Sequence, residues 1–313
     1  MKQLSACVNI TVMDTRSLKY FLCLADNLHF GKASAESHIS ISTLSRQIRQ
    51  LEKELAVTLF VRDNRSVKLT HEGQLFVQYA RDAVGQWSSM RNQLAALNGD
   101  LQGEVSLYCS VTAVYSLLYD LLNEARETFP DIEIKLHTGD PDHAIERVLA
   151  GEEDMSIAAH PQTLPRGLVF KPITFSPLVF IGPVEEAKQW PLPWQASKQV
   201  PSGEFASAWS QVPFIVPEAG LSRQRLDVWF KQLSITPRIY AQVSGNEAIV
   251  TMVSLGLGVG LVPKIVLDNS PVADRVAVLP VQPQLQPYHV GVFVQKKSLN
   301  NPLVKAFWSL LPE

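Results

Sequence analysis

Hydroxyl and guanidinium side chains gather between residues 40 and 55, at a spacing that suits hydrogen bonding to phosphate oxygens and base edges. Apolar residues in this stretch recur at the period of an amphipathic helix, and they are Leu44, Ile48, Leu51 and Leu55. The side chains between them must then face solvent from the early turns, and they include Ser42, Thr43, Ser45, Arg46 and Arg49. Ser40 or Ser42 can cap the start of this helix, since a hydroxyl oxygen accepts from unpaired backbone N–H groups.

The elements around this helix complete a nucleic-acid-binding pattern. A second short helix is expected over residues 31–38, joined to the first by a tight turn, which is the helix-turn-helix arrangement. Residues 59–62 and 66–69 predict a basic hairpin whose Arg62 and Arg65 add DNA contacts, with Arg65 at the tip for the minor groove. Residues 13–69 therefore predict a winged helix-turn-helix domain that binds double-stranded DNA. The alternative is a solvated basic helix face beside an ordinary hairpin.

The charge is unevenly distributed along the chain of 313 residues. The formal net charge is -2, which alone does not favour binding to nucleic acid. Residues 14–98 hold 11 Lys and Arg against 8 Asp and Glu, whereas residues 99–313 hold 16 against 22. A basic N-terminal part on an acidic remainder fits phosphate binding by one end of the molecule.

Cysteine usage and hydropathy indicate the compartment. Cys7, Cys23 and Cys109 are an odd number without CxxC spacing, which disfavours a disulfide framework and a zinc module and favours a reducing compartment. No apolar run approaches the roughly 20 residues of a membrane span, and the N-terminus lacks a signal-peptide core. We expect a cytoplasmic protein without membrane contact. Residues 1–12 carry no periodic pattern and are expected to be a disordered extension before Met13.

Residues 70–98 predict one long helix with a heptad seam. The seam residues follow one another at alternating spacings of 4 and 3, and they are Phe76, Ala80, Ala83, Trp87, Met90, Leu94 and Leu97. A single helix cannot bury such a seam, so a dimerisation helix is expected. The alternative is a helix that packs only on its own domain. Dimerisation would also pair two recognition helices on neighbouring half-sites.

Strands and helices alternate over residues 99–313, which predicts an α/β domain with mainly parallel sheets. The segment 183–212 is rich in Pro, Ser and Gln and is expected to connect two lobes. The first lobe is then expected over about 99–182 and 285–313, and the second over about 183–284.

Four strand-to-helix turns of this part predict a binding pocket for a small carboxylate. In open α/β sheets ligands bind at the carboxyl ends of strands, where helix starts offer N–H groups to anions. The candidate effector-binding residues in these turns are Ser110, Val111, Thr112, His160, Gln162, Glu218, Gly220, Ser222 and Asn246. The alternative for the hydroxyl residues is that they are only helix N-caps.

Several other motifs are discounted as sites. Residues 256–260 read GLGVG, but they follow a predicted helix, whereas a dinucleotide-binding loop follows a strand. His137 and His143 with the nearby aspartates lie at a turn where such residues are common, so no metal site is expected. Cys109 permits a redox-sensor reading, although a buried apolar role is favoured. No cofactor and no catalytic constellation are predicted, and an enzyme with a DNA-binding head is the competing hypothesis from another class.

Segments along the whole chain resemble the LysR-type transcriptional regulators. The resemblance is carried by STLSRQIRQLEKEL from Ser42, LFVRDNRSVKLTHEG from Leu59 and SGNEAIVTMVSLGLGVGLVPKIVLDNSP from Ser244. One departure is Ile41-Ser42, where the family often has Gln-Pro. The resemblance implies a type 2 periplasmic-binding-protein fold for the effector domain, a homodimer or homotetramer, and contact with RNA polymerase.

The resemblance is strongest to the branch of this family that activates the gene of acetohydroxy acid isomeroreductase, an enzyme of branched-chain amino acid biosynthesis. It implies acetolactate or acetohydroxybutyrate as the effector, whereas the residues alone indicate a small polar anion. A regulator of another pathway and a cysteine-based redox regulator remain as alternatives.

Overall fold

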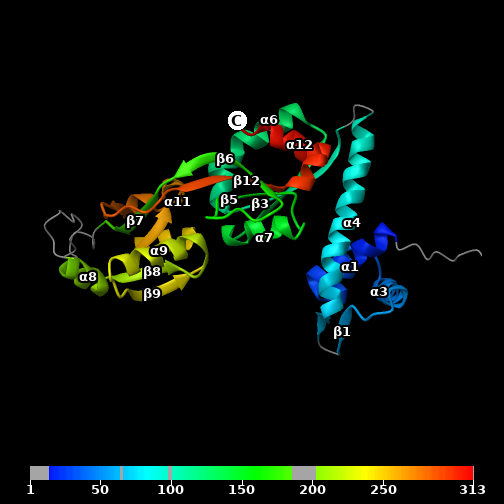
Figure 1. Cartoon of the computed structure of the whole chain (residues 1–313), viewed down its shortest axis with the longest axis horizontal. Coiled ribbons are helices and arrows are strands. Elements are labelled where there is room, and N and C mark those ends of the chain that lie inside the picture. Colours follow the sequence, from blue (N-terminus) through cyan, green and yellow to red (C-terminus); the bar gives the residue numbers. More distant parts are fainter. Residues whose placement is uncertain (1–13, 64–65, 98–100, 185–201, 313) are drawn as a thin grey trace, which may run out of the picture. The chain divides into compact units, whose positions relative to one another are not determined.

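The computed structural model describes residues 14–63, 66–97, 101–184 and 202–312 (Figure 1). The chain forms two compact units: the head comprises Met1–Gly99 and Ala150–Glu152, and the body comprises Asp100–Leu149 and Glu153–Glu313. The expected disordered extension over residues 1–12 and the hairpin-tip residue Arg65 lie outside the described residues.

The head is a helical unit with a small hairpin. Its elements are α1 (Thr15–Asn27), α2 (Phe30–Glu36), α3 (Ile41–Leu55), β1 (Phe60–Arg62), β2 (Val67–Leu69) and α4 (His71–Ala96). Leu44, Ile48 and Leu51 of α3 are buried in one core with Phe21 of α1 and Phe60 of β1. The strands β1 and β2 pair antiparallel. The predicted stripe of α3 thus faces the core, and the opposite face of the helix is left to solvent.

The predicted heptad seam of α4 has a part that packs in the head and a part that is exposed. Ala80 is fully buried in the core of the head, and Phe76 and Ala83 pack against the same core. In contrast, the side chains of Trp87, Met90, Leu94 and Leu97 are exposed. The seam that can meet a second chain is therefore shorter than expected, because its first turns pack against α1 of the same head.

The body contains two five-stranded sheets, the first in the order β4-β3-β5-β12-β6. Its strands are β3 (Gly103–Cys109), β4 (Ile132–Thr138), β5 (Met155–Ala159), β6 (Leu168–Ser176) and β12 (Tyr288–Gln295). The helices of this first lobe are α5 (Val111–Ala113), η1 (Val114–Leu118), α6 (Tyr119–Thr128), η2 (Pro141–His143), α7 (Ala144–Leu149), η5 (Lys296–Asn300) and α12 (Pro302–Leu310). The segment η1 is a π-helix between α5 and α6, a feature that is frequent at functional sites.

The second sheet has the order β11-β7-β10-β8-β9 and forms the second lobe. Its strands are β7 (Leu178–Pro183), β8 (Pro213–Pro217), β9 (Arg238–Val243), β10 (Val259–Pro263) and β11 (Val276–Leu279). The helices are α8 (Ser202–Gln211), α9 (Gly220–Gln232), α10 (Asn246–Ser254), α11 (Lys264–Asp268) and η4 (Ala273–Arg275). The helix α8 lies in the stretch that the sequence indicated only as a connection.

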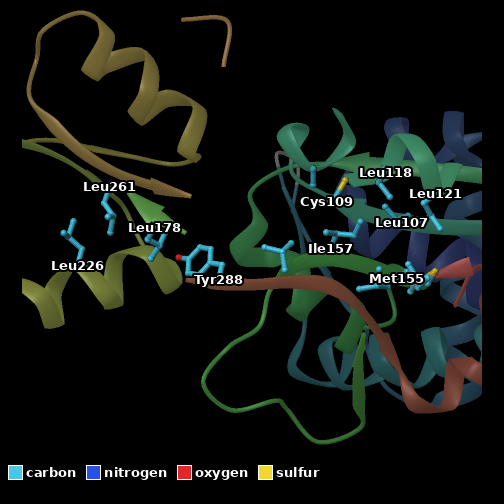
Figure 2. Close-up of a cluster of buried hydrophobic side chains, with 14 of the residues drawn as sticks. Leu107, Cys109, Leu118, Leu121, Met155, Ile157, Leu178, Leu226, Leu261 and Tyr288 are labelled. Carbon is cyan, nitrogen blue, oxygen red and sulfur yellow. The ribbon is translucent and has the colours of Figure 1, made fainter. Parts of the chain in front are cut away.

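The two sheets are mixed, which corrects the expectation of mainly parallel sheets. The strand β12 returns antiparallel to β5 and β6, and β7 runs antiparallel to β10 and β11. Since β7 belongs to the second sheet, the first lobe ends at Ser176 and not near residue 182. The chain passes from the first lobe to the second between β6 and β7, and it returns at the start of β12. Figure 2 shows Tyr288, the first residue of β12, beside Leu178 of β7, so these two connections lie together.

The glycines after α10 serve packing, as the sequence indicated. Gly258 has φ +155, and a Cβ there would lie 2.3 Å from the carbonyl oxygen of Pro213. A Cβ on Gly260 would lie 2.4 Å from Cγ2 of Ile249 on α10. Glycine therefore lets β10 pack closely against β8 and α10.

Candidate functional site

The start of α3 gathers hydroxyl groups at a helix N-terminus. The Ser40 hydroxyl accepts from the backbone N–H of Thr43 at 3.1 Å and lies 2.9 Å from the Ser42 hydroxyl and 2.8 Å from that of Thr43. The N-cap is thus Ser40, one of the two serines expected there. Free N–H groups and the helix dipole favour a phosphate at such an end.

The exposed face of α3 continues this polar surface with positive charge. Arg49 donates to the Ser45 hydroxyl at 3.2 Å, and the Arg46 side chain is exposed. A hollow along this face is lined by Ile41, Ser42, Ser45, Arg46, Arg49, Gln50 and Lys53. Gln50 and Lys53 extend the predicted set, and their position on the polar face of the same helix was the available signal. This surface offers donors of the kinds that bind phosphates and base edges.

Arg62 has a different environment from the arginines of α3. Its guanidinium donates to Glu52 Oε2 at 2.7 Å and lies over the Phe30 ring at 5.3 Å from the ring centroid. The other oxygen, Glu52 Oε1, accepts from the backbone N–H groups of Leu59 and Phe60 at 3.0 and 3.2 Å. Glu52 therefore fastens the hairpin to α3, and Arg62 belongs to this anchor.

A cavity of about 290 Å³ lies between the two lobes of the body. It is lined by Asp140, Pro141, Asp142, His143, Pro217, Glu218, Ala219, Ser222, Val243, Ser244, Gly245 and Asn246. Three of the predicted effector residues, Glu218, Ser222 and Asn246, are in this lining. The residues of the β4–η2 turn also line the cavity, although the sequence analysis discussed them only for a metal site, which it rejected. Their position after β4, which pairs with β3, could have indicated that they lie at the cleft.

Gly220 adjoins the cavity through Asp142. It has φ +82, and a Cβ there would lie 1.8 Å from Oδ2 of Asp142, so only glycine leaves room for that carboxylate. The cavity walls remove water from the Asp142 carboxyl and raise its pKa, and the negative charge of Asp140 raises it further. His143 and the backbone N–H of Leu221 oppose this shift. The start of α9 thus already faces a carboxylate of the chain.

The segment Ser110–Thr112 is outside the lining of this cavity but bridges the lobes beside it. Ser110 caps the helix, accepting from the Ala113 N–H at 3.2 Å, which is the structural role weighed for it. The Thr112 hydroxyl donates to Oε1 of Glu247 at 2.5 Å, and the Thr112 N–H donates to the same oxygen at 3.3 Å. Glu247 belongs to α10 of the second lobe and was not among the predicted site residues. The Val111 side chain is exposed.

His160 and Gln162 do not line the cavity, which corrects the prediction that all four turns converge. His160 Nδ1 lies 2.6 Å from the carbonyl oxygen of Pro161, and its ring packs edge-on against Phe170 at 4.6 Å. Its backbone N–H donates to His289 on β12 at 2.7 Å. The pairing of β5 with β12 therefore holds this turn beside β6, and Gln162 is exposed.

Cys109 is a buried thiol at the end of β3. Figure 2 shows it among Leu107, Leu118 and Leu121, and none of its surface is exposed. Burial raises its pKa to about 12, so the thiol stays protonated at neutral pH and is a poor nucleophile. The residues that the structure describes include no group of three His, Cys, Asp or Glu side chains placed to hold a metal ion.

The described helices include none that is both long and apolar enough to span a bilayer.

Comparison with protein families gives two matches. Residues 15–74 match the bacterial regulatory helix-turn-helix protein, lysR family, and residues 98–313 match the LysR substrate binding domain.

Individual proteins agree with this division. The transcriptional activator IlvY of Salmonella typhimurium is 44% identical over 303 residues, covering 96% of this chain and all of the relative. The regulator IlvY of Escherichia coli is also 44% identical over 303 residues, with 96% and 99% covered. The crystal structure of full-length CbnR with its target DNA has the same fold, with a TM-score of 0.60, 21% identity, and 96% and 99% of the chains covered. These relatives are regulators of transcription and not enzymes, and the chain belongs to the LysR family of bacterial helix-turn-helix transcriptional regulators.

Proposed function

We propose that this regulator binds a promoter for branched-chain amino acid biosynthesis and activates transcription when it binds a small carboxylate, acetolactate or acetohydroxybutyrate. The observation that carries this proposal is the 44% identity to IlvY, which extends over the head and the body alike. Because the similarity covers both the head and the body, we expect this protein to share both the kind of promoter and the effector with IlvY.

DNA binding is assigned to the exposed face of α3 and to the hairpin. Arg46 and Arg49 supply positive charge, and the hydroxyls of Ser42, Thr43 and Ser45 supply short donors near the helix start. Phosphate contacts fix the register of a protein on DNA, whereas contacts to base edges specify the sequence. Arg62 and Arg65 are retained as hairpin contacts, with Arg62 also serving as the anchor to Glu52.

Assembly into a homodimer or homotetramer is assigned to the exposed part of the α4 seam. Trp87, Met90, Leu94 and Leu97 expose apolar surface at heptad spacing, which a second helix would remove from water. Two recognition helices held in this way bind half-sites at a fixed separation. Activation further implies contact with RNA polymerase at the promoter.

The effector is assigned to the cleft between the lobes, with Thr112 and the residues around Ser222 and Asn246 as its contacts. The effector carboxylate would accept hydrogen bonds from the Thr112 hydroxyl and N–H. The hydroxyl and ketone of the effector would contact polar groups of the cavity wall. Effector binding shifts the protein between two arrangements of the lobes only if one arrangement binds it better.

The test uses the purified full-length protein and the promoter of the isomeroreductase gene from the source genome. We expect binding in dilute salt, an increase in transcript on addition of fresh 2-acetolactate, and no consumption of acetolactate beyond its spontaneous decay. Arg46→Ala serves as the DNA-binding control. Consumption of acetolactate by the protein would support an enzyme, and response to a different metabolite in a thermal-shift panel would assign another pathway.

A further inference from the structure

The donors of Thr112 are already occupied by a carboxylate of the chain itself. The Thr112 hydroxyl is 2.5 Å from Oε1 of Glu247, its N–H is 3.3 Å from the same atom, and Thr112 is only 6% exposed. Thr112 follows β3 of the first lobe, whereas Glu247 lies in the first turn of α10 of the second lobe. One carboxylate oxygen therefore joins the lobes through a charge-assisted pair of hydrogen bonds.

An effector carboxylate needs these same donors. It has the chemistry of the Glu247 side chain, two oxygens that only accept hydrogen bonds when ionised. The Thr112 hydroxyl has a single hydrogen, which it already donates to Glu247, so it cannot donate to both carboxylates at once. Occupation by Glu247 and occupation by an effector at this point therefore exclude each other.

Other bridges between the lobes follow the same chemistry. The Ser244 hydroxyl of the second lobe donates to Oδ2 of Asp140 in the first lobe, and Asp142 of the first lobe faces the start of α9 in the second. The lining of the cavity adds Glu218, and among the described residues that line it His143 alone can carry positive charge. Like charges repel across a short distance, so an anion is disfavoured in this arrangement.

We propose that Glu247 is a built-in competitor of the effector, which holds the lobes in an effector-free arrangement by mimicking the effector's carboxylate at Thr112. The effector carboxylate displaces Glu247, and the released bridge lets the lobes rearrange. The apparent affinity for the effector is lowered by the fraction of molecules in which Glu247 occupies Thr112. This inference rests on the proposed function, because it assumes that Thr112 binds the effector.

The test compares Glu247→Gln with the wild-type protein in equilibrium titrations with fresh 2-acetolactate. Glutamine keeps the length of the side chain and removes its charge, so we expect roughly tenfold tighter binding, as expected for loss of a charged acceptor. Acetoin, which has the same carbon skeleton without the carboxylate, should show no such gain. Glu124→Gln, which removes the same charge at an exposed position of α6, should stay within about twofold of wild type.

The change must act through Thr112 and not through the general charge of the cleft. In the Thr112→Val background, Glu247→Gln should therefore give about threefold tighter binding or less. Unchanged affinity in Glu247→Gln, or a full gain in the Thr112→Val background, would overturn the inference while leaving the proposed function standing.

Failure of the wild-type protein and of Glu247→Gln to bind acetolactate would refute the proposed effector. The hydrogen bonds between Thr112 and Glu247 are then tested by urea unfolding in the absence of ligand. Thr112→Val and Glu247→Gln should each lower the midpoint of urea unfolding, and the double variant should lower it no further than the larger single change. Fully additive shifts would overturn the inference.

Discussion

Replacing Glu52 by Gln should loosen the hairpin from α3. The Glu52 carboxylate accepts from the N–H groups of Leu59 and Phe60 through one oxygen and from Arg62 through the other. The side chains of Arg62 and Glu52 are 25% and 15% exposed, so water replaces these bonds only in part. The amide keeps one acceptor oxygen but turns an N–H group toward donors that need an acceptor.

The size of the effect follows from these contacts. A hydrogen bond to a charged group contributes about 1.5–3 kcal/mol, and contacts that share one side chain are not additive. We therefore expect Glu52→Gln to lower the free energy of unfolding of the head by about 2–3 kcal/mol. Glu54→Gln is the matched control, because Glu54 lies on the same helix and accepts only from Gln50 among the contacts described, at 2.8 Å. It should cost less than about 0.5 kcal/mol.

The assay is urea unfolding of the full-length protein together with hydrogen exchange of residues 59–69. Exchange should quicken in Glu52→Gln and remain at the wild-type rate in Glu54→Gln, and promoter binding should weaken because the hairpin loses its position. Equal stability and equal exchange in the two variants would refute the anchoring role of Glu52.

Arg46→Ala should weaken promoter binding by about tenfold with or without effector and should reduce the slope of the logarithm of affinity against the logarithm of salt by about 1, measured by fluorescence anisotropy. Thr112→Ala should bind the promoter like wild type but lose most of its response to acetolactate in a transcription assay; a normal response would show that the pocket is misplaced. Because the pKa of Asp142 is raised mainly by burial, this group lowers stability above its folded-state pKa and the loss is relieved as the pH falls toward the unfolded-state pKa. Protonation of Asp142 removes a negative charge from the cavity, so acetolactate affinity should rise as the pH falls through the folded-state pKa of Asp142 while the ligand stays ionised. Asp142→Asn should flatten that rise in a calorimetric titration. Peroxide should leave the Cys109 thiol unoxidised, because burial raises its pKa to about 12, and Cys109→Ser should retain the effector response; loss of the response in that variant would favour a redox regulator.

Local periodicity was sufficient to predict the head. The apolar stripe of α3 and the turn at Ser40 depend on residues close in sequence, and the structure has both. The heptad pattern of α4 could not show which residues pack within the head and which remain exposed. Ala80, which is buried in the head, and Leu94, which is exposed, occupy equivalent positions in the same heptad pattern. Hydrophobic periodicity reports that a face is buried and not which chain buries it.

The body was predictable as alternating elements but not in its pairing. The strands β7 and β12 pair antiparallel with strands distant in sequence, and no local pattern specifies that choice. The candidate site has the same limit. Glu218, Ser222 and Asn246 could be selected from turns before helices, whereas the bridge from Glu247 to Thr112 joins residues far apart in the chain and appears only when the lobes meet.

The proposed promoter binding by the head and the proposed carboxylate sensing by the body can be tested together in one purified system. Transcript from the isomeroreductase promoter is measured with and without fresh 2-acetolactate, alongside binding of the same DNA. We expect the wild-type protein to bind the duplex in dilute salt, and we expect acetolactate, but not acetoin, to increase transcription. Absence of duplex binding in dilute salt, or a transcript level that acetolactate does not change, would refute the proposed function.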